Sequence, residues 1–170
     1  MRLRSLLFVP GDRPERMQKA LGLGADALIL DLEDAVAPEG KPTARHAVAA
    51  FLRTAKRNVR LFVRINPLDS GLAQDDLAAV LDARPDGIVL PKSEGEATVR
   101  ALIALLESYP AILILPIATE TPAAIFGLGS YRNCSQRLAG LTWGAEDLPA
   151  AIGATAAREE DGSYTTPYQL

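Results

Sequence analysis

The sequence is poor in the residues that most often reveal a protein's chemistry. Its 170 residues contain one cysteine, one histidine and one tryptophan, and aromatic side chains make up 5%. The single Cys134 excludes an internal disulfide, and its local motif YRNCSQR supplies no base that would activate a thiol nucleophile. His46 falls within a predicted helix, which favours a surface or half-buried position over a catalytic one.

Long apolar runs and an excess of positive charge are also missing. The apolar stretch in MRLRSLLFVPGDR is too short for a signal peptide, and no stretch has the length of a membrane span. With a net charge of -3, the sequence lacks the excess of basic residues that is typical of a nucleic-acid-binding protein. The composition, 48% hydrophobic and 23% charged, is typical of a soluble globular domain. We therefore expect a cytoplasmic protein without nucleic-acid or membrane partners.

What the sequence has is a repeat of short apolar runs separated by amphipathic stretches. The runs are rich in Leu, Ile and Val and cover residues 5–10, 27–32, 61–66, 87–92, 112–118 and 138–143. The amphipathic stretches cover residues 14–23, 43–56, 75–83, 94–106 and 122–128. Such runs are typical of parallel strands that are covered on both faces. The pattern predicts six strand–helix units, with Asp12 and the pair Thr121-Pro122 as helix start signals.

Repeated units of this kind form either a doubly wound sheet or a (β/α)8 barrel. The first turn, VPGDRPER, has one glycine where a dinucleotide-binding turn has three. Polar candidates stand instead at the ends of several strands, as in barrel enzymes. The sequence therefore predicts an α/β protein of the TIM-barrel class. We expect residues 1–153 to supply six units of an incomplete catalytic barrel and 154–170 to form a polar C-terminal segment that stops before the last two strands.

Two acidic residues are the main candidates for a metal site. Glu120 in ATETPAA and Asp147 in GAEDL each follow an apolar run and precede a helix start. Adjacent parallel strands would place the two carboxylates side by side, and magnesium is usually held by one or two carboxylates. Alternatively, Glu120 caps the helix that starts near Thr121 and Asp147 stabilises the start of the next helix. The two roles can coexist.

Arg64 is a charged residue inside the apolar run LFVRIN. A lone buried charge is costly, so this guanidinium must either pair with an acidic side chain or contact water. Strand alternation predicts that Phe62, Arg64 and Asn66 share one face. Arg64 would hold a substrate carboxylate through two N–H groups, or would form a structural pair with Asp31 or Asp34.

The motif DLEDAV places three carboxylates in four positions, which demands nearby cations. Asp31 is predicted to face the mouth of the barrel. Asp34 is predicted to contact substrate or metal-bound water. Glu33 either pairs with Arg64 or Lys92 or has only a loop role.

Several segments together carry a family resemblance. They are RSLLFVPGDRPERMQKA, GADALILDLEDAVAPEGKPTAR, VRINP, GIVLPKSE, ETPAA and GLTWGAEDL. In order and spacing they resemble the citrate lyase β-subunit family of the HpcH/HpaI aldolase/citrate lyase superfamily, from Arg4 to about Gly153. The resemblance implies a magnesium-dependent barrel that cleaves or forms a C–C bond in a carboxylated acyl thioester, assembled as a homo-oligomer (trimer or hexamer).

The resemblance also implies roles for individual residues. Glu120 and Asp147 match the metal ligands of the family, and Arg64 matches the arginine that grips the small carboxylate substrate. The expected catalytic residues are Arg64, Glu120 and Asp34, and Gly144 and Ala145 are expected to line the substrate site beside Arg64 and Glu120.

A CoA thioester carries phosphates, which call for a basic patch at the barrel mouth. Arg13, Arg16 and Lys19 fall near one helical face and are candidates for this contact, although surface charge also explains them. Lys41 and Arg45 would balance the DLEDAV acids, contact phosphates, or line a solvated helix.

The expected function is a magnesium-dependent carbon–carbon lyase of the citryl-CoA or malyl-CoA type, acting on an acyl-CoA and an oxo-acid. One alternative is a class II keto-acid aldolase that does not use CoA. The other is a non-catalytic truncated barrel that acts as an assembly subunit.

Overall fold

The computed structural model describes residues 3–56 and 58–165. Five parallel strands form one sheet in the order β1-β2-β3-β4-β5. The strands are β1 (Leu6–Pro10), β2 (Ala27–Asp31), β3 (Arg60–Arg64), β4 (Gly87–Leu90) and β5 (Leu113–Pro116). The α-helices are α1 (Pro14–Ala20), α2 (Lys41–Thr54), α3 (Ala73–Val80), α4 (Glu96–Leu105), α5 (Pro122–Gly127) and α6 (Asp147–Ala151), and 3-10 turns cover Pro38–Gly40, Leu81–Ala83 and Leu128–Arg137.

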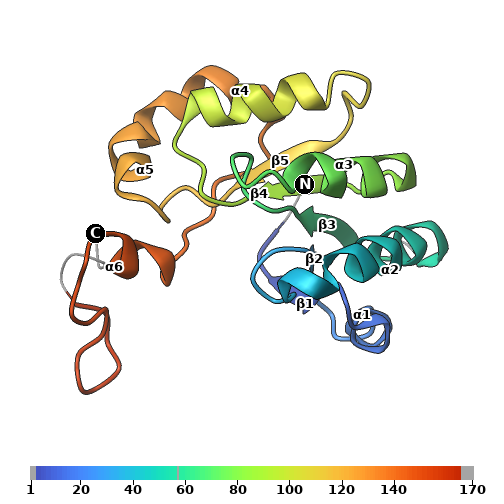
Figure 1. Cartoon of the computed structure of the whole chain (residues 1–170), viewed down its shortest axis with the longest axis horizontal. Helices are drawn as coiled ribbons and strands as arrows, with labels where there is room; N and C mark the ends of the chain where they lie inside the picture. The colour runs from blue at the N-terminus through green and yellow to red at the C-terminus, as the bar shows by residue number, and fades with distance from the viewer. Residues whose placement is uncertain (1–2, 57, 166–170) are drawn as a thin grey trace.

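The strand order decides between the two expected architectures. Each strand pairs with the next strand in the sequence, whereas a doubly wound sheet reverses its strand order at a switch point. The helices α1 to α4 follow the outer side of the curved sheet (Figure 1). This arrangement is an arc of a parallel α/β barrel, as predicted.

The two faces of the sheet bury two separate apolar clusters. The larger lies between the strands and the helices and includes Leu28, Leu30 and Val63. The smaller lies on the inner face and consists of Ala27, Ile29, Phe62, Val89, Leu115 and Ile117. Because side chains alternate along a strand, the inner face also receives the residues that follow Ile29 and Phe62 by two positions, Asp31 and Arg64.

The predicted sixth strand, 138–143, is not continuous. It runs parallel to β5 but forms only two isolated bridges, Ile114 with Leu138 and Ile117 with Thr142. The backbone N–H groups that bond to the β5 side belong to Ala139 and Thr142, at 2.8 and 2.9 Å. These donors are three residues apart, whereas a regular ladder uses every second residue, so the chain bulges between them.

Of the two predicted helix start signals, Thr121-Pro122 is confirmed and Asp12 is not. Asp12 does not cap α1: Arg13 occupies the cap position, and no side-chain cap bond forms there. Asp12 instead faces the Arg13 guanidinium at 3.6 Å. Thr121 caps α5 as predicted, since its hydroxyl accepts a hydrogen bond from the Ala124 N–H at 3.1 Å, and Pro122 stands in the first turn.

The residues after α6 form a small irregular extension. An antiparallel bridge joins Arg158 to Tyr164, and the extension projects from the body of the molecule beside α6 (Figure 1). Residues 166–170 of the predicted polar segment lie outside the described residues.

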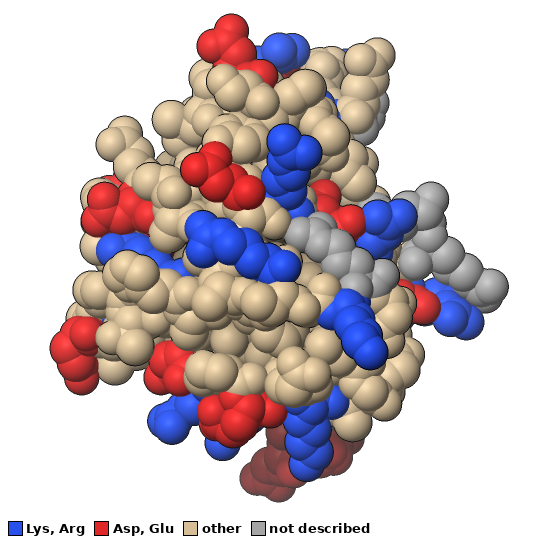
Figure 2. Space-filling model, turned by 90° about the vertical axis from the view of Figure 1, so that its right-hand side faces the viewer, with Lys and Arg blue, Asp and Glu red and all other residues tan. Residues whose placement is uncertain are grey.

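The surface shows no large region of one charge sign on the face drawn in Figure 2, where Lys and Arg alternate with Asp and Glu. In the part of the chain that the structure describes, no helix combines the length and apolar character that crossing a membrane requires.

Candidate active site

A cavity of about 320 Å³ opens at the carboxyl ends of the strands. It is lined by Phe8, Asp34, Arg64, Ile117, Glu120, Thr142, Trp143, Gly144, Ala145, Glu146 and Asp147. The structure therefore brings all the predicted catalytic, substrate-binding and metal-binding residues together in one cavity. The predicted phosphate contacts Arg13, Arg16 and Lys19 are not among its lining residues. The sequence did not predict five of the lining residues: Phe8, Ile117, Thr142, Trp143 and Glu146. Strand alternation gives the signal for Phe8, which lies within β1 opposite Ile29 of the inner face. Ile117 directly follows β5.

Arg64 is held by a buried acid on the neighbouring strand. Its Nε and Nη2 donate to the two carboxylate oxygens of Asp31 at 2.7 and 2.6 Å. Its Nη1 lies 2.9 Å from Glu33 Oε2, and the guanidinium stacks over the Phe8 ring at 4.9 Å. Burial opposes the charge, but these acids raise the pKa of Arg64. The structural pair with Asp31 is therefore formed, while Arg64 still lines the cavity.

Asp31 also shapes the loop that follows it. Its carboxylate accepts the backbone N–H groups of Glu33 and Ala35 at 2.8 and 3.0 Å. Lys41 closes the same loop from α2, since its buried ammonium donates to the carbonyl oxygens of Leu32 and Glu33 at 2.9 and 3.0 Å. The printed contacts of Lys41 are with backbone carbonyls and not with the DLEDAV carboxylates, so Lys41 holds the loop in place, a role that the sequence did not predict.

Asn66 does not share the face of Arg64. It lies beyond the end of β3, and its amide donates to Asp76 of α3 at 2.7 Å and to the Leu32 carbonyl at 3.0 Å. The prediction failed because the strand ends at Arg64, so its alternation does not extend to residue 66. Arg45 completes this helix-side network through Asp76 at 2.7 Å.

Glu120 is buried, with 4% of its surface exposed. Among the described residues, no cationic side chain forms an ion pair with its carboxylate. Its Oε2 accepts the backbone N–H of Lys92 at 2.6 Å. Burial raises the pKa of Glu120 to about 7; the Lys92 N–H opposes this shift, and the charges of Asp147 and Glu33 add to it. The alternative role of Glu120 as a helix cap is wrong, because Thr121 makes that bond.

Gly144 allows the two sides of the cavity to meet. A Cβ at this position would lie 2.7 Å from Ile117 Cγ2 and 2.8 Å from Glu120 Cγ. The backbone cannot yield easily, because the Gly144 N–H and carbonyl both bond to the Thr119 hydroxyl, at 2.9 and 3.0 Å. Only a residue without a side chain fits against Glu120 here.

Lys92 joins the acids of three separate segments. Its ammonium lies 3.1 Å from Glu33 Oε1 and 3.4 Å from Asp147 Oδ1. Glu33 is thus paired with both Arg64 and Lys92, which resolves the alternatives left open by the sequence. Burial raises the pKa of Glu33, and the two cations oppose that shift.

The charges of this cluster fit a divalent cation. Within the described residues, the carboxylates of Asp31, Glu33, Asp34, Glu120 and Asp147 gather around the cationic side chains of Arg64 and Lys92, so acidic groups outnumber basic ones in this cluster. In residues 3–56 and 58–165, no group of three or more His, Cys, Asp or Glu side chains is placed to hold a metal ion. Two carboxylates with open positions for water and substrate oxygens suit magnesium. Glu120 and Asp147 could hold such an ion.

The predicted phosphate-binding trio is not part of this cavity. Arg13, at the cap position before α1, and Arg16 of α1 are exposed, and Lys19 lines a separate hollow with Lys56 and Asn58 near the other end of that helix. His46 is exposed, and its Nδ1 lies 2.7 Å from the Pro42 carbonyl oxygen.

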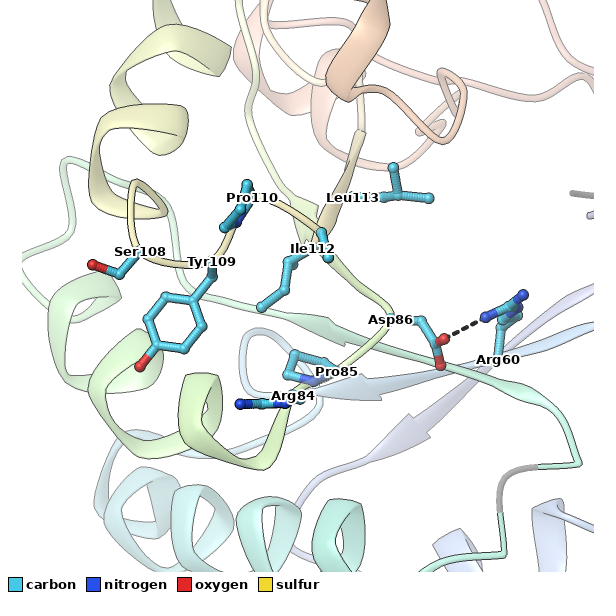
Figure 3. Close-up of a pocket in the computed structure, with 10 residues that line it drawn as sticks. Arg60, Arg84, Pro85, Asp86, Ser108, Tyr109, Pro110, Ile112 and Leu113 are labelled. Carbon is cyan, nitrogen blue, oxygen red and sulfur yellow. Dashed lines mark hydrogen bonds and ion pairs between the residues drawn. The ribbon is translucent and has the colours of Figure 1, made fainter.

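A larger cavity, of about 600 Å³, lies at the opposite ends of β3 to β5 (Figure 3). Two of its polar side chains already have partners: Arg60 pairs with Asp86 at 2.6 Å, and the Tyr109 hydroxyl bonds to Asp82 at 2.6 Å. Barrel enzymes place their chemistry at the carboxyl ends of the strands. The smaller cavity is therefore the candidate active site.

Comparison with known proteins agrees with this geometry. The family model HpcH/HpaI aldolase/citrate lyase matches residues 4–166. The chain belongs to this family. A (3S)-malyl-CoA thioesterase of Cereibacter sphaeroides is 35% identical over 151 residues, covering 88% of this chain and 51% of the relative. A citrate lyase subunit beta-like protein of Mycobacterium tuberculosis is 38% identical over 164 residues, covering 93% of this chain and 53% of the relative.

Solved structures of the family share the fold. The citrate lyase beta subunit of M. tuberculosis, complexed with oxaloacetate and magnesium, superposes with a TM-score of 0.78 at 36% identity over 96% of this chain and 68% of that chain. CitE of M. tuberculosis in complex with magnesium, acetoacetate and coenzyme A gives a TM-score of 0.77 at 36% identity, over 96% and 57%. The chain spans about half the length of the curated relatives that it matches.

Proposed function

We propose that this chain is the catalytic part of a magnesium-dependent carbon–carbon lyase of the citryl-CoA or malyl-CoA type. The observation that carries the proposal is the buried Glu120 in one cavity with Asp147 and Arg64. The substrate would be a carboxylated 3-hydroxyacyl thioester. The names of the relatives and the ligands in their structures, magnesium, oxo-acids and coenzyme A, support this substrate class.

In this proposal Glu120 and Asp147 hold magnesium, which supplies a Lewis acid and a template for substrate oxygens when it is bound. Arg64 has five N–H donors, of which Asp31 takes two and Glu33 faces a third. Its other donors can orient the carboxylate of the substrate. Asp34 lines the cavity with an exposed carboxylate and contacts the substrate as a further catalytic group.

The reaction is a retro-aldol cleavage. The 3-hydroxyl group loses its proton, the bond between C2 and C3 breaks, and its electron pair passes to the thioester fragment. That fragment forms an enolate, which takes up a proton to give the shorter acyl-CoA, while C3 leaves as the carbonyl of an oxo-acid. The cavity residues orient both carboxylate and thioester, so that the breaking bond lies beside the charges that stabilise it.

Product analysis tests the proposal against its two enzymatic alternatives. Malyl-CoA and citryl-CoA are incubated with the protein and magnesium, and oxo-acid, acetyl-CoA and free thiol are measured separately. A lyase forms oxo-acid and acetyl-CoA without free thiol. A thioesterase, the activity named for one relative, releases thiol without oxo-acid. A CoA-independent aldolase cleaves free hydroxy-keto acids instead.

Glu120→Gln provides the control, since it keeps the size of the side chain but removes its charge. We expect this variant to lose magnesium binding and turnover while it keeps its circular dichroism spectrum. A wild-type chain that neither turns over these substrates nor binds magnesium would overturn the proposal and favour the assembly-subunit alternative.

We extend the proposal to the domain organisation, localisation, assembly and CoA contacts of the protein. Residues 1–153 would form the catalytic barrel domain and 154–170 a following segment, in a cytoplasmic homo-oligomer (trimer or hexamer). Arg13, Arg16 and Lys19 would contact CoA phosphates. Replacing Arg13 and Arg16 by Ser should then weaken binding of acetyl-CoA more than binding of oxaloacetate, as measured by calorimetry; equal weakening would contradict this role.

A further inference from the structure

Lys92 has an unusual backbone conformation for its residue type. It follows β4 after one intervening residue and has a φ of 49°, in the left-handed region that a long side chain seldom adopts. Such strain persists only where the surroundings fix it, and it gathers at functional sites. Glycine is the residue that adopts this conformation most readily, because it has no side chain. The lysine at this position therefore calls for an explanation from its contacts.

The left-handed turn lets Lys92 reach the acids in two ways. The backbone N–H points to Glu120 Oε2, at 2.6 Å. The side chain carries its ammonium to Glu33 at 3.1 Å and to Asp147 at 3.4 Å. One residue thereby holds carboxylates that come from the loop after β2, the loop after β5 and the start of α6.

The two ammonium contacts differ in their surroundings. The Glu33 side chain is 5% exposed, while the Asp147 side chain is 35% exposed. Glu33 is buried and needs its cations, because a buried charge without a partner is costly. The contact with Asp147 is longer and open to water, so it is the contact that another cation can replace. This step rests on the proposed function, in which Asp147 is a magnesium ligand.

We propose that Lys92 is the internal counter-ion that sets the magnesium affinity of the site. Its ammonium competes for Asp147 and stays with Glu33 when magnesium binds, while its backbone N–H keeps Glu120 in place. Lys92 is thus a positioning residue that acts through the metal ligands. With the Lys92 ammonium beside Asp147, the site binds magnesium more weakly than its carboxylates alone would.

Magnesium titration by calorimetry on the full chain tests this directly, without any turnover. Lys92→Met removes the ammonium and keeps the length of the side chain, so magnesium should bind about tenfold more tightly or better, given the repulsion between cations a few ångströms apart. Lys92→Arg keeps the charge and should bind magnesium as the wild type does. Lys56→Met, at an exposed lysine outside the cavity, should also leave the affinity unchanged.

Lys92→Gly separates the backbone role from the side-chain role. Glycine keeps the N–H that holds Glu120 and accepts the left-handed conformation, so this variant should fold and should also bind magnesium more tightly. If the wild type binds magnesium but Lys92→Met and Lys92→Gly bind it equally or more weakly, the counter-ion role is wrong and the proposed function stands. If neither the wild type nor the variants bind magnesium, both proposals fail.

Discussion

At the scale of single residues, the two arginines of β3 show how burial changes the value of an ion pair. Arg64 and Arg60 stand at opposite ends of the strand, and each contacts an aspartate at 2.6 Å. The pair of Arg64 with Asp31 is buried, with side chains 12% and 1% exposed, whereas Arg60 is 55% exposed. Breaking a buried pair leaves an uncompensated charge, while an exposed pair contributes little.

We therefore expect Arg64→Met to lower the free energy of unfolding by about 3–5 kcal/mol, because Asp31 and Glu33 lose their main cation. Arg60→Met, the matched control on the same strand, should cost about 0–1 kcal/mol. Urea denaturation of both variants measures the difference. Equal losses would show that the Arg64 pair is no more than a surface contact.

The close approach at Gly144 leads to a second prediction. Gly144→Ala should cost about 1–3 kcal/mol of stability, as overpacking does, and should weaken magnesium binding because the new methyl group pushes on Glu120. Gly129→Ala is the control, since a Cβ there would meet nothing within 4 Å. Thermal unfolding and calorimetry report the two effects. Unchanged magnesium affinity in Gly144→Ala would separate Glu120 from the metal.

At the scale of elements, the start of α5 distinguishes a cap from a candidate ligand. Thr121 accepts the Ala124 N–H, and its hydroxyl donates to Glu94 at 2.8 Å. Thr121→Ala should therefore cost about 0.5–2 kcal/mol, and Thr121→Ser should restore most of it. Urea denaturation checks this. A serine variant as unstable as the alanine variant would mean that the methyl group of Thr121, not its hydroxyl, stabilises the helix start.

The elements were predictable where burial on both faces governs the sequence. The five runs that became β1 to β5 are mainly apolar because helices cover their outer face and the inner cluster covers much of the other. The run 138–143 has a similar composition but lies beyond β5 at the border of the sheet, where it forms only two isolated bridges. Composition does not distinguish a border segment from a central strand, so its continuity was overestimated.

The site was predictable in its members and less so in its connections. Glu120, Asp147 and Arg64 were indicated by charge at the ends of apolar runs, which is costly unless the charge is used or paired. The sequence could not choose between the partners of Arg64, since Asp31 and Asp34 are three residues apart and both near. The role of Lys92 depends on a left-handed turn and a backbone N–H, and neither has a signal in the side-chain pattern.

At the scale of the whole molecule, the sequential strand order places the predicted catalytic, substrate-binding and metal-binding residues at one end of an arc. Consecutive parallel strands end at the same edge, so residues as distant as Asp34 and Asp147 share a cavity. The two further strands that would complete the barrel stay a prediction, because the described residues contain the five strands of one open sheet.

The extension after α6 contacts the rim of this cavity through an aromatic pair. Trp143 lines the cavity and meets the ring of Tyr164 edge-on, with centroids 5.1 Å apart. Arg158 stacks over the same tyrosine at 3.8 Å and also lies 3.7 Å from Glu146 of the cavity wall. The extension therefore shields one side of the only tryptophan in the sequence.

Because that tryptophan stands at the candidate site, its fluorescence reports on the site alone. Tyr164→Ala should shift the emission to longer wavelength, since water replaces the tyrosine ring beside Trp143. Adding magnesium with oxaloacetate should change the emission of the wild type, because Trp143 shares its cavity with Glu120 and Asp147. Tyr109→Ala, at the opposite end of the sheet, should leave the spectrum as it is. An emission spectrum that responds neither to Tyr164→Ala nor to the ligands would place Trp143 away from both the extension and the site.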